Sequence, residues 1–174
     1  MEANQNRISY ADKPKFYAEV ALELKGLADP IWYSYLANAS AVLMQHLPDI
    51  NWVGFYLAVH KQKSFELVLG PFQGRPACVR IDAGRGVCGS AALAREALLV
   101  PDVEAFPGHI VCDSASRSEV VVPMVFEDRL NGDRLLGVLD VDSPTLARFD
   151  EDDKKGLEKL VTTMLLSTTW PLKF

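Results

Sequence analysis

The sequence predicts an α+β fold (an α/β sandwich), in which a mainly antiparallel sheet carries helices packed on one face. Long segments with helical periodicity stand at the two ends of the chain, and strand-like segments fill most of the middle. Short turns separate many of these strands, as in hairpins, which join antiparallel neighbours. With 174 residues, 49% of them hydrophobic, the chain can build one sizeable core. We therefore expect a single domain over residues 1–174, with residues 1–12 as a flexible N-terminus.

Four segments show the periodicity or the end signals of helices. They are Lys13–Lys25, about Pro30–His46, the short Ser90–Arg95, and Phe149–Trp170. Pro14 lies in the first turn of the first segment and Gly26 just past its end, as is typical of helix termini. Asp150 is the expected N-cap of the last helix, and Pro171 follows the end of that helix.

Six segments rich in β-branched, aromatic and other apolar residues are expected to be strands. They are Ile50–Val59, Phe65–Leu69, Ala77–Ile81, Leu98–Val100, Glu119–Phe126 and Arg134–Val141. The stretch from Gly70 to Gly74 should break the sheet, and Asn131-Gly132 should form a tight hairpin turn. The stretch from Asp102 to Ser118 has no strong period, and long irregular segments of this kind are often functional.

Charge and hydropathy exclude several classes of partner. The net charge of -5 and the pI near 5.2 argue against nucleic acid or an anionic membrane as a partner. No apolar run reaches the roughly 18–20 residues that span a bilayer, and the polar N-terminus lacks the apolar core of a secretory signal. The expected compartment is the cytoplasm, with the nucleus as the alternative.

The three cysteines are the first candidates for chemistry. Cys112 stands in the irregular stretch, where a thiol can reach solvent, and Cys88 stands at a helix start, which lowers a thiol pKa. Cys78 falls in an expected strand, and any lone cysteine is more often a small buried hydrophobic residue. An odd count and a reducing compartment argue against a structural disulfide. No Cys-x-x-Cys pair occurs and only His109 lies near a cysteine, so no metal site is expected.

Two further patterns are not expected to bind ligands. The glycine-rich segment from Gly84 to Gly89 matches neither the Walker pattern nor the dinucleotide fingerprint, so nucleotide binding is not predicted. The histidines His46, His60 and His109 show no ligand spacing, and we expect them on the surface or in loops.

A second constellation consists of acidic residues. Asp140 and Asp142 are two apart on a strand, so their side chains leave the same face, opposite Leu139 and Val141. Glu119 begins the neighbouring strand of the expected hairpin, so three carboxylates can converge at one end of the sheet. Their mutual repulsion would raise the pKa of at least one, giving a proton donor near neutral pH, and an ammonium group would relieve it. The alternative is a solvated strand edge whose charges serve solubility.

Two aromatic residues share a face of the first strand. Trp52 and Tyr56 are four apart, with Gly54 between them. This arrangement leaves a small gap at the glycine, in which a thioether or sulfoxide methyl group can lie, since sulfur packs well against aromatic rings. Packing in the hydrophobic core is the alternative for both rings.

A series of motifs along nearly the whole chain carries a family resemblance. In order they are Asn51-Trp52-Val53-Gly54-Phe55-Tyr56, Leu69-Gly70-Pro71-Phe72-Gln73-Gly74, Ala77-Cys78, Gly84-Arg85-Gly86-Val87-Cys88-Gly89, Pro107-Gly108-His109-Ile110-Val111-Cys112-Asp113, Ser118-Glu119 and Gly137-Val138-Leu139-Asp140-Val141-Asp142-Ser143. The sequence resembles the free methionine-R-sulfoxide reductase family, which consists of GAF domains. The resemblance implies a six-stranded antiparallel sheet, with helices on one side and the pocket on the other.

The resemblance also implies roles for individual residues. It makes Cys112 the catalytic cysteine, Cys78 the resolving cysteine and Cys88 the third member, and it leaves open whether Cys112 or Cys88 attacks first. It places five residues in the substrate pocket: Trp52, Tyr56, Glu119, Asp140 and Asp142.

The implied reaction is the reduction of free L-methionine-(R)-S-oxide to L-methionine. A cysteine thiolate attacks the sulfoxide, the resulting sulfenic acid condenses to an intramolecular disulfide, and thioredoxin reduces that disulfide. No metal or organic cofactor is expected, and a homodimer is implied by family habit alone. The rival interpretations are a GAF sensor that binds a cyclic nucleotide or another small effector without turnover, and a bare interaction domain, which leaves the cysteines unexplained.

Overall fold

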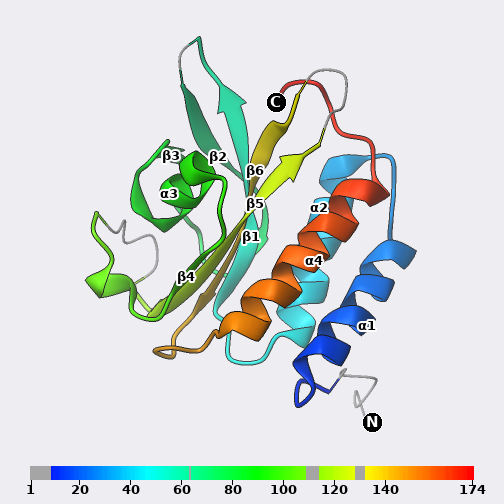
Figure 1. Ribbon diagram of the computed structural model, residues 1–174, viewed down its shortest axis with the longest axis vertical. Helices are drawn as coiled ribbons and strands as arrows, with labels where there is room; N and C mark the ends of the chain where they lie inside the picture. The colour runs from blue at the N-terminus through cyan, green and yellow to red at the C-terminus, as the bar shows by residue number, and fades with distance from the viewer. Residues whose placement is uncertain (1–8, 63, 109–113, 128–131) are drawn as a thin grey trace.

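A computed structural model describes residues 9–62, 64–108, 114–127 and 132–174 of the chain. Six antiparallel strands form one sheet in the order β3-β2-β1-β6-β5-β4, which confirms the predicted fold class (Figure 1). The strands are β1 Trp52–His60, β2 Phe65–Gln73, β3 Arg80–Asp82, β4 Leu98–Val100, β5 Ser118–Phe126 and β6 Arg134–Ser143. The helices are α1 Lys13–Gly26, α2 Trp32–His46, α3 Gly86–Ala94, α4 Glu151–Ser167 and the short 3₁₀ helix η1 Val103–Ala105.

The two faces of the sheet are covered differently. The three long helices α1, α2 and α4 pack on one face, where they bury the larger apolar cluster of the protein (Figure 1). The short helix α3 packs on the other face over a smaller cluster, so the expectation of helices on one face holds for the long ones. Strand alternation assigns the sides of β6: Leu139 and Val141 face the long helices, and Val138 faces α3.

The helical layer is fixed by one buried carboxylate. Asp150 is the N-cap of α4, as predicted, and it forms a capping box with Asp153. Asp153 also accepts a hydrogen bond from Tyr17 of α1 (2.8 Å) and forms an ion pair with Lys13 (2.8 Å). Gly156 allows the close contact, because a Cβ at this position would lie 2.1 Å from the Tyr17 ring. These contacts join the first helix to the last.

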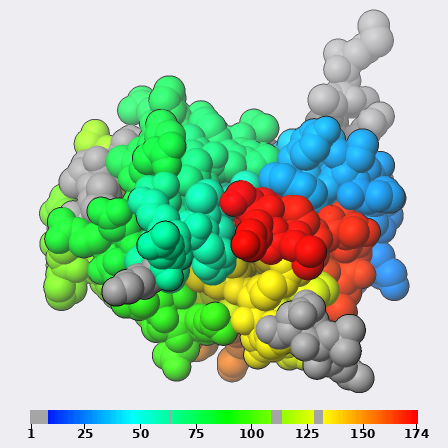
Figure 2. All heavy atoms as spheres, turned by 90° about the horizontal axis from the view of Figure 1, so that it is seen from above, coloured from blue at the N-terminus to red at the C-terminus, as the bar shows by residue number. Residues whose placement is uncertain are grey.

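The C-terminal segment after α4 packs across the end of the sheet. It lies between the blue residues before α2 and the yellow start of β6 in Figure 2. The ring of Phe174 contacts Trp32 at the start of α2, with ring centroids 4.9 Å apart. Arg134 at the start of β6 donates hydrogen bonds to the carbonyl oxygens of Pro171 and Leu172, both at 3.0 Å.

Several element boundaries differ from prediction. Strand β2 continues through the stretch from Gly70 to Gln73 that was expected to break the sheet, because a bulge opposite Phe55 absorbs the extra residue. Strand β3 begins at Arg80, so Cys78 precedes the strand instead of lying within it. Helix α3 begins at Gly86 and not at Ser90, and α4 ends before Trp170.

Three other predictions concern the loops and the membrane. The β5–β6 pairing is confirmed, whereas Asn131 of the expected Asn131-Gly132 turn lies outside the described residues. Residues 1–8 of the expected flexible N-terminus also lie outside them. Among the described helices, none is long and apolar enough to cross a bilayer.

Candidate active site

The strand register brings the predicted acidic and aromatic residues together on the face that α3 covers. Asp142 on β6 pairs with Trp52 on β1 and with Glu119 on β5. One step along, Asp140 pairs with Gly54. Directly opposed residues on neighbouring strands point to the same face. The predicted convergence of the three carboxylates at one region of the sheet is therefore confirmed.

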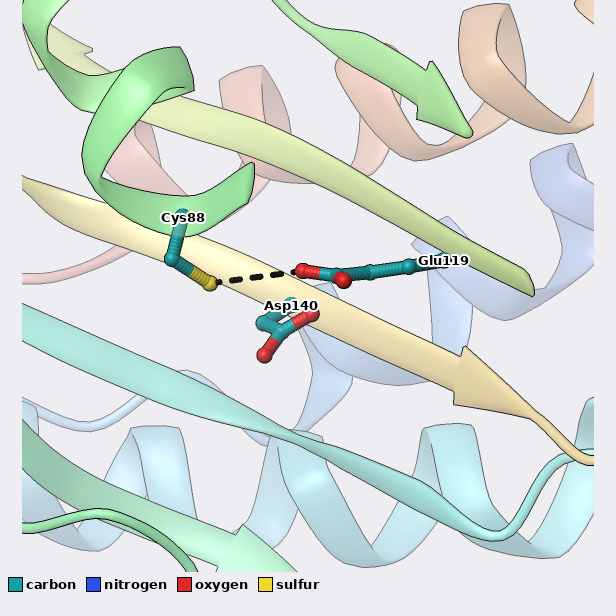
Figure 3. Close-up of side chains that lie close together, drawn as sticks. All are labelled: Cys88, Glu119 and Asp140. Atoms are coloured by element: carbon teal, nitrogen blue, oxygen red, sulfur yellow. Dashed lines mark hydrogen bonds between the residues drawn. The ribbon is translucent and has the colours of Figure 1, made fainter. Parts of the chain in front are cut away.

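Cys88 lies in the first turn of α3, directly over these carboxylates. Its Sγ lies 3.7 Å from Oε1 of Glu119, and the side chains of Cys88, Glu119 and Asp140 point toward one another (Figure 3). One ligand atom from each of the three lies within 4.8 Å of those of the other two. All three residues are buried, with exposed fractions of 4%, 7% and 6%. Gly89 permits this approach, since a Cβ there would lie 2.5 Å from the carbonyl oxygen of Asp82.

Burial controls the protonation of the acids. It is the largest cause that raises the pKa of Glu119 well above its ordinary value, and the charges of Asp140 and Asp142 raise it further. Burial also raises the pKa of Asp140 to about 6, against hydrogen bonds with Cys88 and Glu119 that lower it. The groups that act most on Glu119 include no cation. Glu119 therefore keeps its proton to a higher pH than an ordinary carboxyl group, in the direction that the sequence predicts for a proton donor.

The thiol of Cys88 differs from the prediction based on helix position. Burial raises the pKa of Cys88 well above its ordinary value, and the neighbouring charges of Asp140 and Glu119 add to the shift. The predicted lowering by the helix N-terminus is wrong, because dehydration and acidic neighbours outweigh the helix dipole. Cys88 is a free, protonated thiol that donates a hydrogen bond to Glu119.

The aromatic wall of the site contains three rings. The Trp52 ring stacks on Tyr56, with centroids 5.9 Å apart, and on Phe72, with centroids 5.4 Å apart. A Cβ at Gly54 would lie 2.3 Å from Cβ of Phe72 and 2.7 Å from Cη2 of Trp52. The predicted gap at Gly54 is therefore wrong, because these two side chains already fill it. The sequence does not predict Phe72 as part of the wall, because the sheet is expected to end before this residue, whereas β2 in fact includes it.

The remaining sequence candidates lie at different places. Cys78 is half-buried beside the wall and is disulfide-bonded, whereas Cys112 and His109 lie outside the described residues. His46 contradicts its predicted surface position, because it is buried in the helical layer with its Nε2 2.8 Å from Oε2 of Glu23. His60 is exposed at the end of β1, as expected.

Comparison with known proteins identifies the family. Residues 34–165 match the family model described as GAF domain. Over 167 residues the chain is 44% identical to the free methionine-R-sulfoxide reductase of Escherichia coli, an alignment that covers 94% of this chain and 96% of that protein. This chain belongs to the free methionine-R-sulfoxide reductase family. The family member of Saccharomyces cerevisiae is 41% identical over 161 residues, covering 89% of this chain and 87% of that protein.

The structural likeness extends to a substrate complex within the family. A solved structure of the free methionine-R-sulfoxide reductase of Neisseria meningitidis, in complex with its substrate, superposes with a TM-score of 0.81. The two chains are 44% identical, and the alignment covers 92% of each. The fold of this chain is therefore that of the family over nearly its whole length.

The cluster of Cys88, Glu119 and Asp140 also has the sulfur and oxygen donors that a divalent cation could use. Metal ligands must be deprotonated, however, and burial holds protons on Cys88 and Glu119. In this state the cluster offers hydrogen-bond donors beside the carboxyl group of Asp140. That combination suits a small polar molecule with a positively charged group better than a metal ion.

Proposed function

We propose that this protein reduces free L-methionine-(R)-S-oxide to L-methionine. The observation that carries the proposal is the buried cluster of Glu119, Asp140 and the Cys88 thiol beside an aromatic wall, in which burial raises the pKa of Glu119. The family supports it, because relatives named free methionine-R-sulfoxide reductase align over most of the chain. The site supplies two features that the reduction of a sulfoxide needs, an acid with a raised pKa and aromatic rings that can contact sulfur.

Recognition of a free amino acid follows from the charge of the site. Glu119 and Asp140 are buried, the charges of Asp140 and Asp142 act on Glu119, and a substrate ammonium group would offset the repulsion among these acids. We assign this role to Asp140 and Asp142, which lie on the same face of β6. The Trp52 ring, stacked between Tyr56 and Phe72, provides the apolar contact for the S-methyl group. A peptide-bound methionine has no free ammonium group, so it lacks the feature that this pocket binds.

Glu119 is proposed as the acid. The sulfoxide oxygen must gain a proton as its sulfur is attacked, since an oxide anion is costly in an apolar pocket. The pKa of Glu119 is raised well above its ordinary value because burial and the neighbouring aspartates disfavour its ionised form. The donor in this scheme is therefore the carboxyl whose environment most strongly favours the neutral state.

Cys112 is proposed as the nucleophile. The raised pKa of Cys88 favours Cys112 over Cys88 in this role, because the buried Cys88 thiol keeps its proton and a protonated thiol is a poor nucleophile. The Cys112 thiolate attacks the sulfoxide sulfur, methionine leaves, and Cys112 becomes a sulfenic acid that carries the oxygen. Cys78 then displaces this oxygen as water, forming a disulfide, and thioredoxin returns both sulfurs to thiols. That Cys78 is disulfide-bonded while Cys88 is free supports this division of roles.

A coupled assay tests the proposal. The purified protein is mixed with thioredoxin, thioredoxin reductase and NADPH, and NADPH oxidation is followed with the R and the S epimer of free methionine sulfoxide separately. We expect turnover with the R epimer alone and no turnover with a peptide that contains the same sulfoxide. If a folded protein caused no NADPH oxidation with either epimer, the result would contradict the proposal and favour a GAF sensor without turnover.

Cysteine variants separate the roles of the thiols. Each protein is first reduced and then freed of the reductant, and the methionine released per enzyme is measured, so that only the first turnover is seen. Cys112→Ser should release none, Cys78→Ser should release one equivalent and then stop, and Cys88→Ser should retain the first release. Loss of the first release in Cys88→Ser alone would reverse our assignment of the nucleophile. The implied homodimer and cytoplasmic location remain predictions, of which the first is checked by light scattering.

A further inference from the structure

The segment that carries Cys78 has little regular structure of its own. Residues 74–79 connect β2 to β3 without forming a helix or a strand. At its far end, the Leu69 amide donates a hydrogen bond to the carbonyl oxygen of Val79 at 3.0 Å. Between its ends, two side chains of β1 donate hydrogen bonds to its backbone. These are the same two aromatic residues that form the wall of the proposed pocket.

Both contacts are hydrogen bonds to main-chain carbonyl groups. Tyr56 donates from its hydroxyl to the carbonyl oxygen of Cys78 itself, at 3.0 Å. Trp52 donates from Nε1 to the carbonyl oxygen of Arg75, at 3.1 Å. A main-chain carbonyl has few alternative donors once it faces a buried surface, so each bond restricts where the segment can lie.

The two donors are themselves fixed. Trp52 and Tyr56 are each only 2% exposed, and their stacked rings belong to a central strand. Burial raises the pKa of the Tyr56 hydroxyl, and the nearby acids raise it further, so the group remains a donor at all physiological pH values. The indole Nε1 of Trp52 can only donate. The direction of both hydrogen bonds is therefore constant.

Gly74 brings the segment close to the wall at its start. Its φ of +130° favours glycine, and a Cβ at this position would lie 2.6 Å from Cδ1 of Trp52. Contact between the segment and the wall thus begins at Gly74, continues through Arg75 and includes Cys78. The segment rests on the rings over most of its length.

We propose that Tyr56, assisted by Trp52, is a positioning residue for Cys78. By holding the Cys78 carbonyl, the hydroxyl restricts the sulfur to the small region from which it can form its disulfide. In that step the Cys78 thiol is oxidised, the sulfenic sulfur of its partner is reduced, one S–S bond forms and water leaves. The assignment of Cys78 as the resolving cysteine rests on the proposed function, but the stability of its disulfide can be measured without any substrate.

The experiment compares two matched tyrosine variants. Tyr56→Phe keeps the ring and its stacking on Trp52 but removes the donor. Tyr35→Phe makes the same chemical change at a buried tyrosine of α2 on the opposite face of the sheet. Each protein is equilibrated in buffers of oxidised and reduced dithiothreitol. The fraction of Cys78 in the disulfide is then read by alkylation and mass spectrometry.

We expect the equilibrium constant for formation of the Cys78 disulfide to fall about fivefold to tenfold in Tyr56→Phe. A change of this size corresponds to the net free energy of one hydrogen bond. A tenfold change equals a shift of about 30 mV toward a less negative potential. Tyr35→Phe should match the wild-type constant, even if its melting temperature falls. Equal constants in wild type and Tyr56→Phe, or equal shifts in both variants, would overturn the proposal.

A second variant covers the case in which Tyr56→Phe does not fold. Gly74→Ala leaves both donors in place and displaces the segment from Trp52, and it should weaken the disulfide in the same direction. An unchanged constant in a folded Gly74→Ala protein would also count against the proposal. Failure of the proposed function has a different signature: neither sulfoxide epimer is consumed, while Tyr56→Phe still shifts the disulfide equilibrium.

Discussion

On the helical face of the sheet, Asp153 is fully buried and is surrounded by Lys13, Arg148 and the Tyr17 hydroxyl. On the opposite face, Glu119 and Asp140 are almost as deeply buried, and their strongest electrostatic neighbours are acids. The first face neutralises its buried carboxylate with cations, whereas on the second face burial raises the pKa of the acids, so that they bind protons more readily. An ion pair between a carboxylate and a cationic side chain is a fixed structural contact, whereas a proton bound to a carboxyl group can be transferred. This difference separates the part of the protein that holds the fold from the part that is suited to chemistry.

The largest expected effect lies on the helical face. Asp153→Ala should lower the free energy of unfolding by about 3–5 kcal/mol, because it leaves the buried Arg148 and the half-buried Lys13 without their shared carboxylate. Urea unfolding of both proteins at pH 7 measures the difference. The exposed neighbour Asp152 provides the control, since Asp152→Ala should cost under about 1 kcal/mol. Similar losses in the two variants would show that the cation cluster contributes little.

Glu119→Gln should have the opposite profile. The amide keeps the size of the protonated side chain but cannot supply the proton, so kcat for methionine sulfoxide should fall about 10²- to 10⁴-fold. The free energy of unfolding should stay within about 0.5 kcal/mol of wild type or rise, because the substitution removes a buried acid. Steady-state kinetics and urea unfolding on one preparation give both numbers. Glu104→Gln, at an exposed position of η1, is the matched control and should change neither.

Loss of stability together with activity in Glu119→Gln would break the comparison. It would mean that the acid on the α3 face serves the fold in the same way as Asp153. Retained activity would leave the fold argument intact but would transfer the proton-donor role to another group, for which Asp142 is the alternative.

Part of this contrast was predictable from the sequence. Strand alternation and the expected hairpin predicted that Glu119, Asp140 and Asp142 converge, because register and pleat follow from local pattern. The spacing could not reveal that Cys88 lies over these acids, or that burial raises its pKa although the thiol lies near a helix N-terminus. That outcome depends on where α3 packs and on how completely it excludes water.

The aromatic wall shows a second limit of prediction. The gap at Gly54 was inferred from residues of one strand, but its occupant Phe72 comes from β2. The stretch Gly70-Pro71 predicts a break in the sheet, whereas a bulge lets β2 continue past it. Ser40 of α2 donates a hydrogen bond to the carbonyl oxygen of Pro71 at 3.2 Å. A contact from a distant helix of this kind has no signal in the local sequence.

The pH dependence of stability should distinguish the two faces in turn. Asp140 has a pKa of about 6 in the folded protein against 3.8 as the ordinary value, and it is faced by Cys88 of α3, Glu119 of β5, Tyr56 of β1 and its strand neighbour Asp142. Because the folded pKa is raised, the folded protein binds more protons than the unfolded chain between these values. Stability attributable to Asp140 is therefore full below about pH 4 and declines as the pH rises to about 6.

Asp140→Asn removes this decline. Relative to the variant, the wild type should lose of the order of 2–3 kcal/mol between pH 4 and pH 6.5. Urea unfolding of both proteins across that interval measures the difference curve. A difference that grows in the other direction, with the wild type gaining stability as the pH rises, would show that Asp140 is held ionised by a favourable partner.

The smallest effect concerns the packing of the wall. Gly54→Ala places a methyl group 2.3 Å from Cβ and 2.8 Å from Cα of Phe72, so β1 and β2 must separate, and Cη2 of Trp52, at 2.7 Å, must move as well. Overpacking of this kind costs about 1–3 kcal/mol, and displacement of Trp52 should raise KM for the sulfoxide as well. Gly26→Ala, at a glycine with nothing within 4 Å of its added Cβ, is the control and should be neutral or slightly stabilising. If Gly54→Ala lowered stability but left KM unchanged, the Trp52 ring would be a packing element of the α3 face and not a wall of the substrate pocket.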